Sequence, residues 1–114
     1  MSGDKKLFIL WPNDNLHTSQ LRVMKYATNA MLNHWWEEVT VIVWGATVRL
    51  AAENAAIQER IKMAQHAGVV FSACVDCVNQ FGAAETFKTL GIEAAPWGAP
   101  LTALIHGGEH LICV

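Results

Sequence analysis

Residues 68–79 have the sequence GVVFSACVDCVN, in which a glycine precedes an apolar run that ends at two closely spaced cysteines. The run from Val69 to Ala73 has the length and apolar character of a strand buried in a parallel sheet. Helical sequence follows it, so Cys74 and Cys77 fall at a strand-to-helix turn. The stretch therefore predicts the strand-then-helix unit from which parallel α/β sheets are built.

Strand-like and helix-like segments alternate along the rest of the chain, without a linker or an internal repeat. Apolar and β-branched runs predict further strands at 7–11, 39–44, 92–95 and 111–114. Apolar spacing and glycine stops predict helices at 18–33, 47–53, around 57–64, 75–90 (interrupted by Gly82) and 101–106. We therefore expect an α/β fold, a doubly wound three-layer α/β/α arrangement around a mostly parallel sheet of about five strands.

The composition bounds both the size of the protein and its partners. A chain of 114 residues has room for a single domain, here residues 1–114. Hydrophobic residues make up 53% and charged residues only 16%, which is too little charge to cover a small monomer and predicts self-association. The net charge is −2, with both signs scattered along the chain, so we expect no direct nucleic-acid binding.

The segments that resemble targeting signals are too short to act as such. Two lysines precede the apolar run 7–11, but a Pro-Asn-Asp-Asn turn follows at once, so the N-terminus is not expected to be a secretory signal. We also expect no membrane association, because no run approaches the length of a membrane span. Three cysteines, two of them close together, suggest a reducing, cytoplasmic location. Cys113, inside the last strand, is expected to be a small core residue.

The two thiols at the turn are the leading candidates for catalytic residues. Ligand sites in parallel sheets gather beyond the carboxyl ends of the strands, where helix N-termini and their free amides point. Cys74 is the first residue after the predicted strand, and there these amides favour a nucleophilic thiolate, although Asp76 opposes this. Cys77 lies about one turn further on and is expected to pack inward. The structural alternative is that both cysteines simply fill the turn.

Four residues in two other loops at the same edge are candidates for substrate binding. Asn13 and Asp14 follow the first predicted strand, and Trp97 and Gly98 follow the fourth. We expect all of them to lie close to Cys74, with Asn13 orienting a substrate and Trp97 excluding water. The alternative for Asn13 and Asp14 is turn formation alone.

Two further tryptophans stand at strand ends. Trp11 ends the first predicted strand and Trp44 ends the second. Aromatic side chains mostly serve cores and interfaces, so packing is the favoured role for both.

Three chemistries use a pair of thiols in this arrangement: a persulfide carrier, a dithiol redox protein and a zinc site. Zinc is the weakest of these, because His106 and His110 would have to complete the ligand set. The intervening Gly107-Gly108 precludes a rigid helical pair, and the last strand carries His110 toward the opposite edge of the sheet. Because this ligand set is weak, no metal is expected. A glycine-rich phosphate fingerprint is absent from the sequence, so no other cofactor is expected either.

Several segments in fixed order resemble the DsrE/DsrF-like family, which includes YchN-type and sulfur-relay proteins. These segments are the first strand with its polar turn, Glu38-Val39-Thr40-Val41 leading to GATVRLA at 45–51, AGVVFSAC at 67–74, and Gly107-Gly108 before the last strand. The similarity covers nearly the whole chain. It implies a flavodoxin-like fold and a homotrimer or hexamer.

The resemblance also implies a function. In sulfur-relay members the cysteine after the third strand carries a persulfide, and Cys74 matches it, which implies a possible sulfurtransferase with donor and acceptor proteins as partners. Cys77 departs from the single-cysteine members and resembles others with a Cys-x-x-Cys. Two alternatives therefore stay open: a dithiol oxidoreductase using Cys74 and Cys77, and a non-catalytic oligomeric module that binds a small ligand or partner.

Overall fold

The computed structural model describes residues 5–114, and the start of the N-terminal segment considered above as a secretory signal, residues 1–4, lies outside them. Five parallel strands form one sheet in the order β4-β3-β2-β1-β5. The strands are β1 (Lys6–Trp11), β2 (Glu38–Val43), β3 (Val70–Cys74), β4 (Glu93–Ala95) and β5 (His110–Cys113). The expected flavodoxin-like α/β fold is confirmed.

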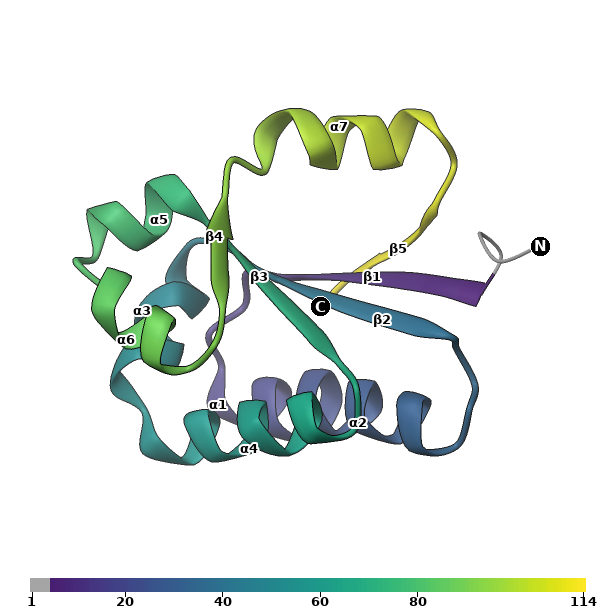
Figure 1. Cartoon of the computed structure of the whole chain (residues 1–114), viewed down its shortest axis with the longest axis horizontal. Coiled ribbons are helices and arrows are strands. Elements are labelled where there is room, and N and C mark those ends of the chain that lie inside the picture. Colours follow the sequence, from purple (N-terminus) through teal and green to yellow (C-terminus); the bar gives the residue numbers. More distant parts are fainter. Residues whose placement is uncertain (1–4) are drawn as a thin grey trace.

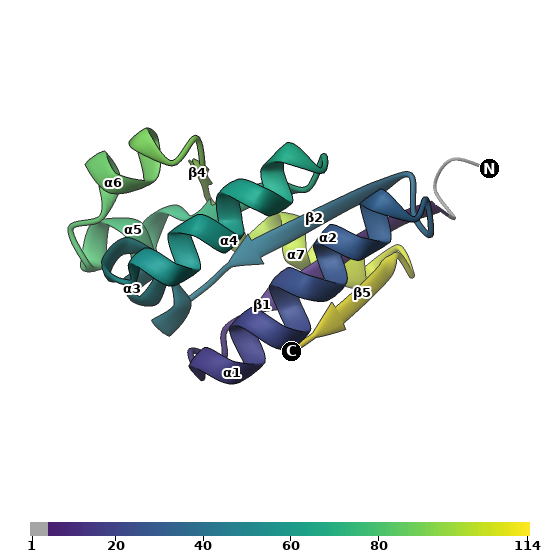
Figure 2. The same cartoon turned by 90° about the horizontal axis from the view of Figure 1, so that it is seen from below.

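Seven helical segments cover one face of the sheet. The chain steps from β1 to β4 in a single direction, and right-handed crossovers then place every intervening helix on the same side. These segments are α1 (Leu16–Thr18), the π-helical η2 (Ser19–Met24), α2 (Lys25–Leu32), α3 (Ala46–Glu53), α4 (Ala55–His66), α5 (Val75–Gln80) and α6 (Ala84–Thr89). Figure 2 looks onto this face, with α2 and α4 lying along nearly the same direction as β2.

Within residues 5–114, the opposite face carries a single helix, α7 (Gly98–His106). The connection from β4 to β5 returns past three strands, so α7 crosses the sheet on the side that the other helices leave open (Figure 1). Most of its residues are exposed, and Leu101 is the buried one. The two faces are therefore covered unequally.

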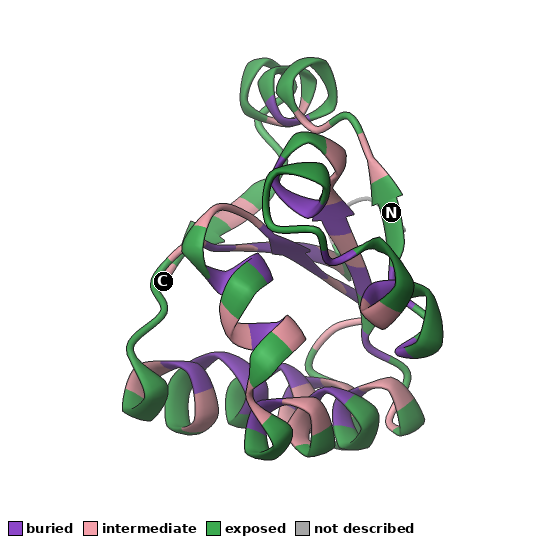
Figure 3. Ribbon diagram, turned by 90° about the vertical axis from the view of Figure 1, so that its left-hand side faces the viewer, coloured by how far each residue is buried: buried purple, intermediate pink, exposed green. Residues whose placement is uncertain are grey.

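The core lies between the sheet and the seven segments. Side chains alternate along each strand, so that Leu7, Ile9 and Trp11 of β1 point to the same face as the residues paired with them on β2. Figure 3 shows the buried strands at the centre of the molecule. The largest fully buried side chains are those of Trp11, Phe87, Ile9, Met24, Ile42, Ile57 and Ile61.

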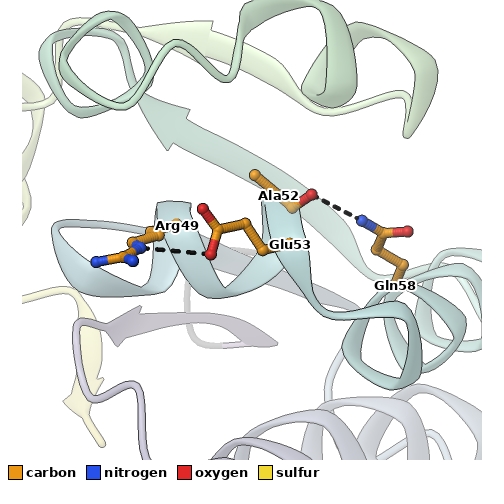
Figure 4. A network of polar contacts seen from close by, with 4 residues as sticks. All are labelled: Arg49, Ala52, Glu53 and Gln58. Carbon is orange, nitrogen blue, oxygen red and sulfur yellow. Dashed lines mark hydrogen bonds and ion pairs between the residues drawn. The ribbon is translucent and has the colours of Figure 1, made fainter.

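A corner between α3 and α4 holds α3 in place (Figure 4). Asn54 ends α3 and caps α4, where its side chain accepts a hydrogen bond from the Ile57 amide at 3.0 Å. Gln58 donates back to the carbonyls of Ala51 and Ala52 at the end of α3, at 3.0 and 3.1 Å. Because this corner fixes the end of α3, it also fixes the loop at its start, which contributes to the site described below.

Two expectations from the sequence need correction. Cys113 is exposed, not a core residue, because β5 is an edge strand. The helix expected at 18–33 begins earlier, at Leu16, and contains a six-residue π-helical segment. Across the part of the chain that the structure covers, residues 5–114, no helix combines the length and apolar character needed to cross a bilayer.

Candidate functional site

The candidate site lies where the strand order reverses. From β3 the chain passes to α5 on the well-covered face, whereas from β4 it passes to α7 on the other face. The two connections therefore diverge at the carboxyl ends of adjacent strands, the position at which open α/β sheets form ligand-binding crevices. Cys74 ends β3 and pairs with Ala95, and Trp97 follows β4.

Cys74 and Cys77 are brought together by one turn of backbone. Cys74 is the N-cap residue of α5 in an extended conformation, and Cys77 is the third residue of that helix. N-cap and third-position side chains face one another, as in a capping box. Cys74 is half-buried, whereas Cys77 is buried, with 9% of its surface exposed. The expectation that Cys77 packs inward is confirmed.

The environment of Cys77 keeps it protonated near neutral pH. Burial is the main cause that raises the pKa of the Cys77 thiol, and the neighbouring Cys74 side chain and the Asp76 carboxylate raise it further. The Gly45 amide donates a hydrogen bond to Cys77 Sγ at 3.3 Å and opposes the rise. The pKa of Cys77 remains above its ordinary value, so only a small fraction is thiolate at neutral pH.

Gly45 adopts a backbone conformation that side-chain-bearing residues avoid. Its φ is 70° and its ψ is −129°. A Cβ atom at this position would meet no other atom within 4 Å, so the requirement for glycine is conformational. Sequence analysis did not identify Gly45 as a partner of Cys77, because a backbone donor leaves no signature in residue type.

Trp97 reaches β3 through a side-chain hydrogen bond. Its indole Nε1 donates to Ser72 Oγ at 2.8 Å. Ser72 lies two residues before Cys74, so strand alternation places both side chains on the same face of the sheet. Trp97 is half-buried, and Gly98 beside it is exposed as the first residue of α7. Sequence analysis missed Ser72, although the two-residue spacing to Cys74 is visible in the sequence.

Asn13 and Asp14 lie at the same edge but further along the sheet. They follow β1, which is separated from β3 by β2, a displacement of about 10 Å at the usual strand spacing. Both are exposed. The Asn13 side chain accepts a hydrogen bond from the Asn15 amide at 3.0 Å, the turn-forming role considered as the alternative.

The end of β1 is closed by a buried polar network. The Trp11 indole donates to Ser19 Oγ at 3.0 Å, and that hydroxyl donates to the Asn13 carbonyl at 3.1 Å. The Thr47 hydroxyl bonds the Trp11 carbonyl and accepts from the Trp44 amide at 3.2 Å. Trp11 is fully buried, so its favoured packing role is confirmed.

The histidines considered as metal ligands lie away from the thiols. His110 begins β5 at the amino edge of the sheet and packs against Trp36, with ring centroids 5.4 Å apart. Between residues 5 and 114 there is no cluster of three or more His, Cys, Asp or Glu side chains that could hold a metal ion.

An all-parallel α/β domain with a Cys-x-x-Cys at its strand-order reversal is the class that fold and site define. The model of the DsrE/DsrF-like family matches residues 5–113, so the chain belongs to the DsrE/DsrF-like family. A solved structure of a conserved protein of unknown function from Bacteroides thetaiotaomicron is similar, with 36% identity and a TM-score of 0.97 over 100% of this chain and 98% of that chain. No curated protein matches the chain.

Proposed function

We propose that this protein is a sulfur-relay protein in which Cys74 carries a persulfide. The observation that carries the proposal is the position of Cys74, a half-buried thiol at the strand-order reversal of a DsrE/DsrF-like domain. The Cys74 thiolate attacks the outer sulfur of a donor persulfide, and the donor cysteine leaves as a thiolate. An acceptor thiolate then attacks the outer sulfur on Cys74, and Cys74 leaves in turn. Neither transfer requires an external oxidant.

The candidate binding residues have distinct roles in this proposal. Trp97 shields Cys74 from water on the face of the sheet that carries α7, since its indole is held against Ser72 on that face. Gly98 leaves room for the incoming cysteine because it carries no side chain. Asn13 and Asp14 are exposed at the same edge and offer polar contacts to a docked donor or acceptor protein.

The proposed assembly is a cytoplasmic homotrimer or hexamer. Large apolar side chains are exposed on both sides of the monomer: Leu32 (60%) and Met63 (57%) line a groove between α2 and α4, and Ile105 (59%) lies on α7. Exposed apolar patches of this kind mark interaction surfaces. Light scattering at micromolar concentration is expected to show a trimer or hexamer, and a stable monomer would contradict this part of the proposal.

Intact-mass spectrometry after incubation with a cysteine persulfide tests the sulfur-carrier role. The wild-type chain is expected to gain one sulfur atom, which peptide mapping assigns to Cys74. Cys74→Ser is expected to lower loading by about a hundredfold, since a serine hydroxyl is not ionised at neutral pH. Cys113→Ser is the matched control and is expected to load normally. Equal loading of Cys74→Ser and wild type would refute the proposal.

A dithiol oxidoreductase is the second candidate, favoured by the N-cap and third-helical positions of Cys74 and Cys77, whose side chains face one another. In that case a disulfide substrate oxidises the pair without any gain of sulfur, and both Cys74→Ser and Cys77→Ser abolish turnover. Under the sulfur-relay proposal, Cys77→Ser still loads sulfur. The mass of the Cys77→Ser chain after persulfide treatment therefore separates the two candidates.

A further inference from the structure

We infer that Cys77 discharges the Cys74 persulfide, releasing hydrosulfide and closing a Cys74–Cys77 disulfide. The inference rests on the proposed function, because it requires a persulfide on Cys74. It adds a second outcome for the carried sulfur: transfer when an acceptor docks, and release as hydrosulfide when none does.

The step balances within the protein. The Cys77 thiol loses its proton to solvent, and its thiolate attacks Sγ of Cys74, the inner sulfur of the persulfide. A new bond joins the two cysteine sulfurs while the bond to the terminal sulfur breaks, and that sulfur leaves with the electron pair as hydrosulfide. The terminal sulfur gains two electrons and the cysteine pair loses two. An external dithiol then reduces the disulfide by exchange and returns the protein to its starting state.

The geometry places Cys77 on the inner side of the Cys74 sulfur. Cys77 is buried beneath the turn, whereas Cys74 is partly open to solvent. An incoming acceptor therefore reaches the outer sulfur, while Cys77 lies next to the inner one. The two residues stand at the N-cap and third positions of α5, where side chains face one another across a single turn.

The surroundings of Cys77 hold its sulfur in place and slow its attack. The Gly45 amide, 3.3 Å from Cys77 Sγ, connects the thiol to the start of α3. Burial, Cys74 and the Asp76 carboxylate raise the pKa of Cys77, and only the thiolate is the nucleophile. A persulfide on Cys74 therefore persists long enough for an acceptor to dock before Cys77 displaces it.

The experiment compares discharge with and without the second thiol. Cys113→Ser protein, which removes the exposed thiol, is loaded briefly with inorganic polysulfide and freed of reagent by gel filtration. Intact mass and released sulfide are then followed over time. We expect the extra sulfur to disappear, the mass to fall two hydrogens below the reduced chain, one sulfide to appear per chain, and a disulfide to map to Cys74 and Cys77.

The same protein with Cys77→Ser added is expected to keep its sulfur at least about tenfold longer, because the intramolecular nucleophile is gone. Cys77→Ala serves as a second variant if the serine hydroxyl disturbs the buried position. Equal decay with and without Cys77, or sulfide release without a Cys74–Cys77 disulfide, would overturn the inference while leaving the carrier role intact. Failure of the Cys77 variants to take up sulfur on Cys74 would overturn the carrier role and the inference with it.

Discussion

The ends of β1 and β3 lie at the same edge of one sheet, and each leads into a helical segment. The two ends differ in burial and in the side chains that they carry. The end of β1 is sealed, because Trp11 is fully buried and hydroxyls of Ser19 and Thr47 satisfy its indole and carbonyl. The end of β3 carries two thiols, one of them partly open to solvent. A strand end closed by buried hydrogen bonds contributes to stability, whereas one that carries thiols can take part in a reaction.

The strand-order reversal accounts for the difference. The connection from β1 and that from β2 run to the same face, so their ends pack under a common set of helices. The connections from β3 and β4 run to opposite faces, so the segments that follow these two strands diverge. Substitutions at the β1 end should therefore lower the free energy of unfolding and leave sulfur loading unchanged. Substitutions at the β3 end should lower sulfur loading and leave the free energy of unfolding nearly unchanged.

Trp11→Ala is expected to have the largest effect on stability. Removing a fully buried tryptophan leaves a cavity and takes away the indole donor of the Ser19 hydroxyl, which together lower the free energy of unfolding by about 3–5 kcal/mol. Urea denaturation measures this loss. Sulfur loading of the fraction that remains folded should match wild type, and a folded Trp11→Ala protein that cannot load sulfur would break the comparison.

Thr47→Val tests the polar part of the same seal. Valine has a similar shape but removes the hydroxyl that bonds the Trp11 carbonyl and the Trp44 amide, which then keep only the 3.4 Å hydrogen bond between them, at a cost of about 1–3 kcal/mol. Thr102→Val is the matched control, because the Thr102 hydroxyl bonds the Gly98 carbonyl on an exposed helix. Equal losses for the two valine variants would show that the β1 network is not a special source of stability.

Gly45→Ala sharpens the comparison, because Gly45 joins the end of β2 to the thiol site. Alanine is strained at a φ of 70°, so we expect a loss of about 1 kcal/mol or more in unfolding free energy. Gly98→Ala is the control, since Gly98 is not in the positive-φ region and a Cβ there meets no atom within 4 Å. A lower thermal unfolding midpoint for Gly98→Ala than for Gly45→Ala would contradict this account of the loop.

Ionisation of the Cys77 thiol should lower the stability of the folded protein at alkaline pH, and this is the smallest of the expected effects. Its pKa is raised in the folded protein, chiefly by burial, so between the unfolded and folded pKa values the folded state binds more protons than the unfolded state. This contribution to stability is fully present below the ordinary thiol pKa and is lost as the pH rises through the folded value. Cys77→Ala should flatten that decline in denaturation midpoints measured across alkaline pH, whereas Cys113→Ser should leave it unchanged.

Much of the fold follows from local sequence. The apolar runs placed all five strands to within a few residues, and Gly68, Gly82 and Gly91 mark helix ends, where each has a positive φ. The π-helical segment at Ser19–Met24 is different, because its apolar spacing resembles that of an ordinary helix. Cys113 was misplaced because only the sheet order reveals that β5 is an edge strand.

The candidate site was predictable only in part. Alternation of strand and helix located the edge and singled out Cys74, since parallel strands all end on one side. The contacts of Gly45 with Cys77 and of Ser72 with Trp97 join residues 32 and 25 positions apart. Such contacts depend on which strands become neighbours and on how far each loop reaches, and neither is encoded in local residue patterns.

The central claim, that the end of β3 presents Cys74 as the nucleophile above a buried Cys77, is tested most directly by alkylation rates in the folded protein. The measurement uses Cys113→Ser, which removes the exposed competing thiol, with iodoacetamide and peptide mapping at neutral pH. Cys74 is predicted to react at least about tenfold faster than Cys77, which is buried and kept protonated. Modification of Cys77 at the same rate as Cys74, or faster, would contradict the account.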